Sequence, residues 1–220
     1  MDLIGATVFG SETSAKPLTE RIGVFGGAFD PPHHGHLALA RAALEQLALD
    51  SLHIIPTGQA WHKTRTLSAP EHRLAMTQLA FGNLPRVEVD EREMRRTGPT
   101  FTIDTLQALL VENSQAQLYL LMGEDQFAAF RQWHRWQDIL EIAIICIAAR
   151  AQSTLTPIKF DAFPGLEDRF FALQLPQMPV SATQIRQLMA SGAIGASELN
   201  QLVSEPVGRY ISLHQLYSLR

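Results

Sequence analysis

The chain has 220 residues, of which 46% are hydrophobic and 18% are charged, and its formal net charge at pH 7 is −4. This composition excludes the fibrous and disordered classes, and the acidic balance argues against a protein that binds nucleic acid through a broad basic surface. The single cysteine, Cys146, excludes an intrachain disulfide and a thiolate-rich metal site, and it favours a reducing, cytoplasmic location.

The first twenty residues differ from a targeting signal. They lack a basic start and a long apolar stretch, and Asp2 and Glu12 occupy positions where a signal peptide avoids acids. We therefore interpret residues 1–20 as a loose leader and residues 21–220 as a single domain. The longest apolar run, 142–149, is about half as long as a membrane-spanning helix, so we expect no membrane association.

From Arg21 onward, strand-like segments alternate with helix-like segments. The first strand is predicted at 22–25, and apolar residues at helical spacing predict a helix over about 34–49. Pro70 favours a second helix over 70–81, since proline is tolerated in a first turn. The other predicted strands are 52–55, 86–89, 118–122, 142–148 and 170–173, and a further helix is predicted at 102–111.

The predicted strands are largely apolar and do not alternate clearly between apolar and polar residues. Strands of this kind, separated by helices, are typical of a parallel sheet that is covered on both faces. The expected fold class is therefore α/β, a doubly wound parallel sheet, with a small helical portion at about 181–220. Ligands of such sheets bind beyond the carboxyl ends of the strands, so the segment after the first strand is the first candidate for a site.

That segment, residues 26–36, reads GGAFDPPHHGH and leads into the first helix, where backbone amides and the helix dipole favour an anion. Its two leading glycines let a ligand approach the backbone closely. We expect Gly35 to place a bend between His33 and His36, so that both imidazoles face one spot. Imidazoles can donate hydrogen bonds to phosphate oxygens and, when protonated, offset developing negative charge. The segment therefore predicts phosphate chemistry.

Two other interpretations of these histidines compete with phosphate binding. Lone histidines are most often surface loop residues, but paired glycines, two prolines and a histidine pair at one strand-to-helix connection favour a built site. A water-activating zinc site would need nearby cysteines or a clear third ligand, and the helical His-Glu-x-x-His pattern is missing. We therefore predict no metal ligands on the protein. The glycine spacing matches neither the Walker P-loop nor the dinucleotide fingerprint.

The segment resembles the GxFDPxHxGH signature of the nucleotidyltransferase superfamily, which transfers a nucleoside monophosphate from a triphosphate. A second superfamily element, Ile-Ser-Ser-Thr-x-Ile-Arg, is similar to residues 180–186, which read VSATQIR. Hydroxyl groups at a helix start that Ser181 would cap, one turn before Arg186, make a second anion pocket. The competing interpretation is an ordinary capped helix with a solvated arginine.

Within the superfamily, the chain is most similar to the bacterial nicotinate-nucleotide adenylyltransferases, over nearly all of the sequence after Arg21. The similarity is carried by His62-Lys63 with Arg73, by TFTIDTL at 100–106, by MGEDQ at 122–126 with Trp133-His134, and by residues 207–217. The chain departs from the family pattern at Ala60-Trp61, where the family has two prolines, at Ala182, where it has a hydroxyl, and at Phe101, where it has tyrosine.

The resemblance implies a Rossmann-like nucleotidyltransferase fold and adenylyl transfer from ATP to nicotinate mononucleotide, which yields deamido-NAD and pyrophosphate in NAD biosynthesis. It implies in-line attack without a covalent intermediate, with Mg²⁺ carried by the ATP phosphates. It assigns catalytic roles to His33, His36 and Arg186. ATP would contact Gly26, Gly27, Phe29, His33, His36, Gly123, Asp125, Ser181, Thr183 and Arg186, and nicotinate mononucleotide would contact His62, Lys63, Thr102 and Trp133.

Other functions are compatible with the histidine motif. Phosphopantetheine adenylyltransferases and cytidylyltransferases share the His-x-Gly-His loop, although they have no need of the Thr102 segment or of Trp133. A fragment of a class I aminoacyl-tRNA synthetase is disfavoured by the short, negative chain and by the lack of a lysine-rich KMSKS-like loop. A non-catalytic nucleotide sensor could use the same scaffold. The expected partners are thus small molecules and not nucleic acid, and the oligomeric state is left open.

Overall fold

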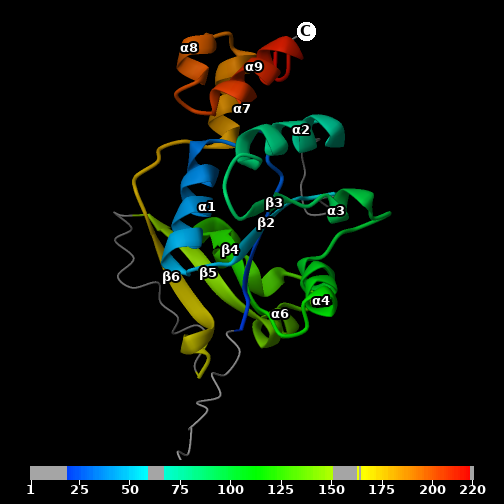
Figure 1. The fold of residues 1–220 in the computed structure, drawn as a ribbon. Helices are drawn as coiled ribbons and strands as arrows, with labels where there is room; N and C mark the ends of the chain where they lie inside the picture. Colours follow the sequence, from blue (N-terminus) through cyan, green and yellow to red (C-terminus); the bar gives the residue numbers. More distant parts are fainter. Residues whose placement is uncertain (1–18, 59–66, 151–162, 164, 219–220) are drawn as a thin grey trace, which may run out of the picture.

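A computed structural model describes residues 19–58, 67–150, 163 and 165–218, which include only the last two residues of the predicted leader (Figure 1). At its centre lies a sheet of six parallel strands in the order β3-β2-β1-β4-β5-β6. The predicted α/β class and doubly wound parallel sheet are confirmed. The strands are β1 (Arg21–Gly27), β2 (Ser51–Pro56), β3 (Val87–Val89), β4 (Gln117–Gly123), β5 (Ala143–Arg150) and β6 (Phe170–Leu175).

The direction in which the sheet grows reverses at β1, which lies between β2 and β4. The chain first builds the sheet outward from β1 to β3, and then returns to add β4 on the other side of β1. In a doubly wound sheet, this switch places the ligand region beyond the carboxyl ends of the two central strands. Here β1 ends at Gly27 and β4 ends at Gly123, so two of the predicted glycines end the two central strands.

Helices cover both faces of this sheet (Figure 1). α1 (His34–Gln46) packs on one face, and α4 (Thr102–Glu112) and α6 (Trp136–Ile142) pack on the other. Leu121 of β4 belongs to the apolar cluster under α1, whereas Leu120 belongs to the cluster under α4 and α6. Because successive strand residues point to opposite faces, a strand that is covered on both sides has an apolar sequence throughout.

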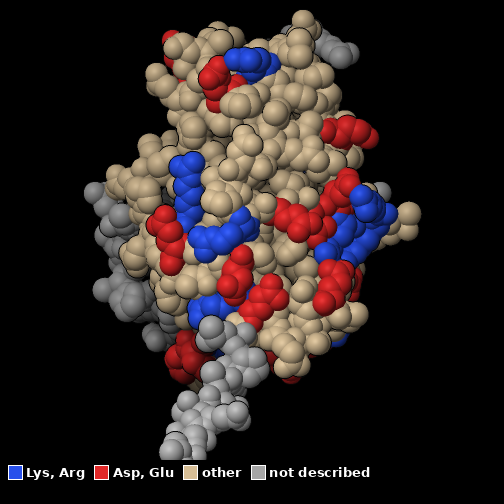
Figure 2. Space-filling model, viewed as in Figure 1, with Lys and Arg blue, Asp and Glu red and all other residues tan. Residues whose placement is uncertain are grey.

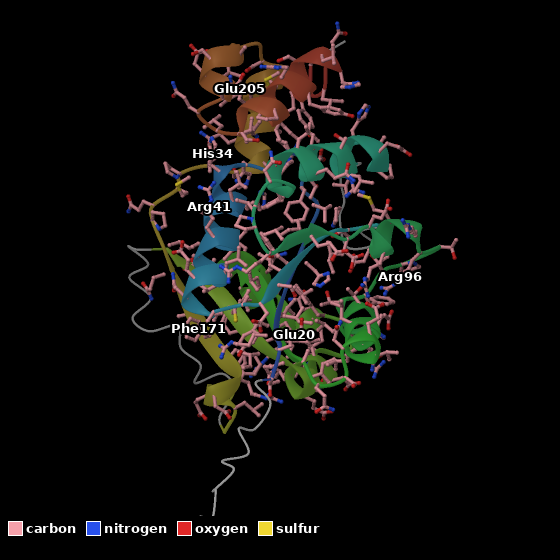
Figure 3. All side chains as sticks on the ribbon, in the orientation of Figure 1. Glu20, His34, Arg41, Arg96, Phe171 and Glu205 are labelled. Carbon is pink, nitrogen blue, oxygen red and sulfur yellow. The ribbon has the colours of Figure 1, made fainter. Side chains whose placement is uncertain are left out.

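The C-terminal helices form a further small layer, drawn in orange and red in Figure 1. α7 (Ala182–Ala190), α8 (Ala196–Leu199) and α9 (Glu205–Leu213) pack with α2 (Pro70–Phe81) around a third apolar cluster. This layer also touches the start of α1, where the backbone N–H of His34 donates to a carbonyl oxygen after α8 over 2.9 Å (Figure 3). The predicted C-terminal helical portion is therefore present, and it lies next to the histidine segment.

Several element boundaries differ from the predictions. α1 ends at Gln46 and not at Leu49, because Ala48 adopts a left-handed conformation (φ 46°) that a right-handed helix cannot include. Ile142 belongs to the end of α6 and not to β5. Very short helices escaped prediction, since one turn or two carry little apolar periodicity. Besides α6 they are α3 (Arg92–Arg95), α5 (Glu124–Ala128), η1 (Phe130–Gln132) and η3 (Glu167–Arg169).

The surface of the described residues carries mixed charges. On the face shown in Figure 2, acidic and basic side chains are interspersed, and no large area of that face has a single sign of charge. None of the helices in the described part of the chain combines the length and the apolar character that crossing a membrane requires.

Candidate active site

The two predicted imidazoles come together at the start of α1. His33 immediately precedes the helix and has an extended backbone (φ −141°), and His36 lies in the first helical turn. Their rings stack with centroids 3.8 Å apart and planes inclined by 29°. The connection after β1 thus presents two adjacent imidazoles, as the spacing predicted.

Gly35 acts differently from the prediction. It lies inside α1, and the backbone leaves the helical conformation at His33. A Cβ atom at Gly35 would stand 3.1 Å from the His33 ring and 3.5 Å from a methyl group of Val180. The predicted bend at Gly35 was therefore wrong. Glycine leaves room for the His33 ring here, because a larger residue would require that ring to shift by a few tenths of an ångström.

The hydrogen bond to His36 determines which of its ring nitrogens carries the proton. The backbone N–H of His33 donates to Nδ1 of His36 over 3.1 Å. In the neutral ring Nδ1 is then the acceptor, so Nε2 carries the hydrogen. His36 therefore offers an Nε2–H donor, which is the kind of group that a phosphate oxygen accepts from.

His33 is held in its neutral form. Only 9% of the residue is exposed. Burial, with a smaller contribution from the neighbouring His34, lowers the pKa of His33 to about 4. This ring therefore acts as an uncharged hydrogen-bonding group at neutral pH before a ligand arrives. A bound polyanion would favour its protonation, because negative charge stabilises an imidazolium.

Replacing His33 with asparagine is expected to flatten the dependence of stability on acid pH. The unfolded chain protonates His33 near its ordinary pKa of 6.5, whereas the folded protein protonates it only near 4. The unfolded state thus binds more protons in that window, and as pH falls this group removes on the order of 3 kcal/mol from the free energy of unfolding. Urea unfolding of both proteins between about pH 7.5 and pH 4.5 measures the difference. Equal slopes would contradict the neutral burial of His33.

Phe29 supports the histidines from within the core. The residue is 1% exposed, and its ring contacts His36 edge to face at a centroid distance of 5.2 Å. Gly27 leaves room for this ring, since a Cβ atom there would stand 3.0 Å from it. The Phe29 side chain therefore packs under His36, so only the backbone of Phe29 is available for the contact with ATP that the resemblance implies. A Cβ atom at Gly26, in contrast, would meet no atom within 4 Å.

The second predicted motif lies against the first. Ser181 precedes α7, and its Oγ accepts a hydrogen bond from the backbone N–H of Gln184 over 3.2 Å, which confirms the predicted cap. Arg186 donates through Nη2 to Oγ1 of Thr183 over 2.9 Å and through Nη1 to the carbonyl oxygen of Asp30 over 2.8 Å. The Arg186 contact joins residues 156 positions apart. Because both hydroxyl groups accept these bonds, each keeps its own proton for a ligand.

Arg73, which the resemblance singled out without a role, ties three connections together. It is 1% exposed. Its guanidinium donates to the carbonyl oxygens of Ala28 at 3.1 Å, Thr57 at 2.7 Å and Ser68 at 3.1 Å. These residues follow β1, follow β2 and precede α2. Arg73 therefore holds the start of the histidine segment, the end of β2 and the segment before α2 in fixed positions relative to one another.

The remaining residues assigned to ATP lie at the end of β4. Gly123 immediately precedes α5, and its backbone N–H donates to Oε1 of Gln126 over 3.1 Å. Asp125 is exposed in the first turn of that helix. Since β1 and β4 are paired parallel strands, their carboxyl ends lie at the same edge of the sheet.

A pocket of about 350 Å³ is lined by Pro99, Phe101, Gln132 and His134. The rings of Phe101 and His134 lie 4.3 Å apart between centroids, inclined by 35°. Thr102 and Trp133, which were predicted to contact nicotinate mononucleotide, are the sequence neighbours of Phe101 and His134. Thr102 is the first residue of α4, and the half-buried Trp133 packs edge to face on Phe130 of the core at 5.6 Å.

Sequence reasoning assigned the acceptor to Thr102 and Trp133, and it did not single out the side chains of Phe101 and His134 that line the pocket. The sequence carried a signal for this pocket lining: an aromatic residue, Phe101, precedes Thr102, and a second aromatic residue, His134, follows Trp133. His62 and Lys63, the other residues predicted for this side, lie outside the described residues.

Comparisons with known proteins identify the family. A family model described as "Cytidylyltransferase-like" matches residues 24–188. A curated relative from Albidiferax ferrireducens, named "Probable nicotinate-nucleotide adenylyltransferase", is 53% identical over 198 residues, which cover 90% of this chain and 98% of the relative. The chain belongs to the nicotinate-nucleotide adenylyltransferase family. A relative of the same name from Bordetella petrii is 39% identical over 90% of this chain and 99% of its own length.

Solved structures support the fold of this family member. Nicotinic acid mononucleotide adenylyltransferase from Plasmodium falciparum, complexed with APC, superposes with a TM-score of 0.73 at 16% identity, over 90% of this chain and 97% of that one. The same enzyme complexed with NaAD gives a TM-score of 0.72 at 16% identity over the same shares of the two chains. The predicted Rossmann-like nucleotidyltransferase fold is therefore confirmed.

Proposed function

We propose that this protein transfers the adenylyl group of ATP to nicotinate mononucleotide, giving nicotinate adenine dinucleotide and pyrophosphate in NAD biosynthesis. The contact between the two phosphate-type motifs, in which Arg186 of α7 donates to the carbonyl oxygen of Asp30 in the histidine segment, carries the proposal. Family membership at 53% identity supplies the substrate class. Phosphopantetheine or cytidylyl transfer is not favoured, because curated relatives at 37% to 53% identity share the nicotinate-nucleotide name.

The reaction needs alignment and charge neutralisation and no protein nucleophile. An oxygen of the 5′-phosphate of nicotinate mononucleotide bonds to the α-phosphorus of ATP. The bond from that phosphorus to the oxygen that bridges to the β-phosphate breaks, and pyrophosphate leaves with the electron pair. His36 would donate through Nε2–H to a non-bridging oxygen of the transferring phosphate, with His33 beside it. Arg186, Ser181 and Thr183 would hold the β- and γ-phosphates at the start of α7.

The adenosine of ATP would lie over the ends of β1 and β4. The space in front of Gly26 is open, which allows a ligand to approach the backbone there. Gly123 offers a second glycine backbone at the neighbouring strand end, where it is partly exposed, and the exposed carboxylate of Asp125 can accept hydrogen bonds from ribose hydroxyls. In this arrangement the nucleotide would lie beyond β1 and β4, where the direction of sheet growth reverses.

Magnesium is proposed to enter with ATP. Within residues 19–58, 67–150, 163 and 165–218, no group of three or more histidine, cysteine, aspartate or glutamate side chains is placed to hold a metal ion. The oxygens of a triphosphate are the hard ligands that Mg²⁺ prefers, so we regard this ion as part of the nucleotide substrate.

The pyridine ring of the acceptor is proposed to enter the pocket that Phe101 and His134 line, against the outer surface of this pair. Two aromatic side chains at this pocket suit a flat, electron-poor ring. Thr102 is the first residue of α4, immediately after Phe101, and its backbone and hydroxyl would contact the same ligand. The acceptor would thus be held by segments that differ from those holding the triphosphate.

Replacing His134 with alanine is expected to raise KM for nicotinate mononucleotide about fivefold and to leave KM for ATP within about twofold, since one aromatic contact contributes about 1 kcal/mol. Initial rates with each substrate varied in turn measure both constants. Gln137→Ala, at an exposed position of α6, is the matched control. An unchanged KM for the acceptor in the His134 variant would remove this ring from the binding site.

The direct test of the proposed function is pyrophosphate release by the purified protein with Mg-ATP and one of three acceptors. Release with nicotinate mononucleotide, well above release with nicotinamide mononucleotide, is the expected result. Release with phosphopantetheine only would keep the phosphate chemistry and overturn the acceptor. ATP binding with no release for any acceptor would overturn the proposal in favour of a non-catalytic nucleotide sensor.

A further inference from the structure

Asp30 lies where four segments of the chain meet. The residue is 1% exposed. Its Oδ1 accepts a hydrogen bond from the hydroxyl of Tyr217 over 2.7 Å, and its Oδ2 accepts one from the backbone N–H of Ser68 over 3.3 Å. Its carbonyl oxygen accepts from Arg186. One residue therefore joins the β1–α1 connection to the segment before α2, to α7 and to the turn after α9.

Tyr217 is the most distant of these partners, since it follows Asp30 by 187 positions. It is half-buried in the turn after α9, and its backbone is left-handed (φ 65°). Burial and the nearby charge of Asp30 raise the pKa of Tyr217, so the phenol keeps its proton and acts as the donor. A carboxylate buried as deeply as Asp30 depends on such donors, because an unsatisfied buried charge is costly.

A change at Asp30 would act on both phosphate-facing motifs. Asp30 precedes His33 by three residues in the same connection, and its backbone holds the guanidinium of Arg186. If the carboxylate lost the Tyr217 donor, it would shift to satisfy its buried charge elsewhere, and the backbone attached to it would move. The pocket lined by Phe101 and His134 belongs to other segments. The consequence should therefore fall on the ATP side of the site.

We propose that Tyr217 and Asp30 form a positioning pair that holds the β1–α1 connection and α7 at the spacing which the triphosphate of ATP requires. Neither side chain is assigned to the substrate itself. The pair acts through the backbone of Asp30 on His33, His36 and Arg186. The kinetic part of this inference rests on the proposed function, whereas its binding part depends only on recognition of ATP.

Tyr217→Phe is the informative variant, because it removes one oxygen and keeps the ring. Tyr210→Phe is its matched control: Tyr210 is also half-buried in the C-terminal layer, and its hydroxyl lies 3.0 Å from Nδ1 of His72, away from Asp30. For Tyr217→Phe we expect kcat/KM for ATP to fall about tenfold, with KM for nicotinate mononucleotide within about twofold. Tyr210→Phe should keep both constants. The melting temperatures of the two variants should agree within a few degrees.

Calorimetric titration with a non-hydrolysable ATP analogue, without acceptor, gives a second readout. Tyr217→Phe should bind the analogue several-fold more weakly than Tyr210→Phe does. This titration also separates the two proposals: if the wild-type protein binds the analogue but forms no dinucleotide, the proposed function fails while the positioning pair is still tested. Equal analogue affinity in the two variants, or an unchanged kcat/KM for ATP in Tyr217→Phe, would overturn the inference. A parallel rise of KM for both substrates would also overturn it, because that pattern indicates general loosening.

Asp30→Asn completes a double-mutant cycle. If the two side chains act as a pair, the double variant should lose about as much kcat/KM for ATP as the more damaging single variant alone. Losses that multiply would show that the two residues act independently and would overturn the pairing. Intact folding of each variant is checked by circular dichroism before the rates are compared.

Discussion

The His36→Ala variant is expected to lower kcat about 100-fold or more and to leave the fold intact. The reason is that His36 presents an Nε2–H donor, fixed by the hydrogen bond that its Nδ1 accepts from the backbone of His33. Removing one donor aimed at charge that develops in the transition state costs about 10²- to 10³-fold in other enzymes. Steady-state rates of pyrophosphate release at saturating ATP and nicotinate mononucleotide measure the loss.

His34→Ala is the neighbouring control for this experiment. His34 lies at the start of α1 with its ring directed to the C-terminal layer, where Nε2 is 3.3 Å from the carbonyl oxygen of Asn200 (Figure 3). Its kcat should stay within about twofold of the wild-type value, since surface hydrogen bonds contribute little. If His36→Ala retains wild-type turnover, His36 is not a catalytic residue of this protein.

The Arg73→Met variant is expected to lower the free energy of unfolding by about 3 to 5 kcal/mol. Methionine keeps part of the buried volume but leaves the carbonyl oxygens of Ala28, Thr57 and Ser68 without the donor that now serves all three. Each buried polar group that loses its partner costs about 1 to 3 kcal/mol. Urea denaturation followed by circular dichroism measures the change in the unfolding midpoint.

Arg41→Met provides the control for Arg73→Met with the same chemical change. Arg41 is exposed on α1 (Figure 3), and substitutions at such positions usually change stability by less than about 0.5 kcal/mol. If Arg73→Met is no less stable than Arg41→Met, the buried guanidinium does not hold the three connections. A stable Arg73→Met with lower activity would point instead to a direct role at the site.

Most of the fold could be predicted because its long elements carry their own periodicity. The helix at 70–81 was predicted to the residue, since Pro70 marks its start and apolar residues repeat at helical spacing up to Phe81. The parallel sheet followed from strands that are apolar on both faces, as β4 is. The short helices α3 and α5 could not be predicted in this way, because they depend on hydrogen bonds and contacts with the rest of the protein.

The candidate site could be predicted where its side chains come from residues that are close together in the sequence. The pair of histidines and the Ser181 cap follow from local spacing, and the structure brings them together. The role of Gly35 was predicted wrongly: it does not bend the backbone but leaves space for the ring of His33. The position of that ring is set by packing, which the local sequence does not show. The lining by Phe101 and His134 was missed because these two residues meet only when α4 and the segment after β4 are assembled.

The order of residues alone was enough to predict a doubly wound α/β fold and a phosphate site after the first strand, and its motifs carried the family resemblance. It could do so because helix periodicity, strand composition and turn residues act over a few positions. Only the folded protein decides that Tyr217 meets Asp30 and that Arg73 serves three connections, since these contacts join segments that lie far apart in the chain. Such contacts depend on burial, which creates the need for each buried charge or carbonyl to find a partner, and no local pattern specifies which partner that is.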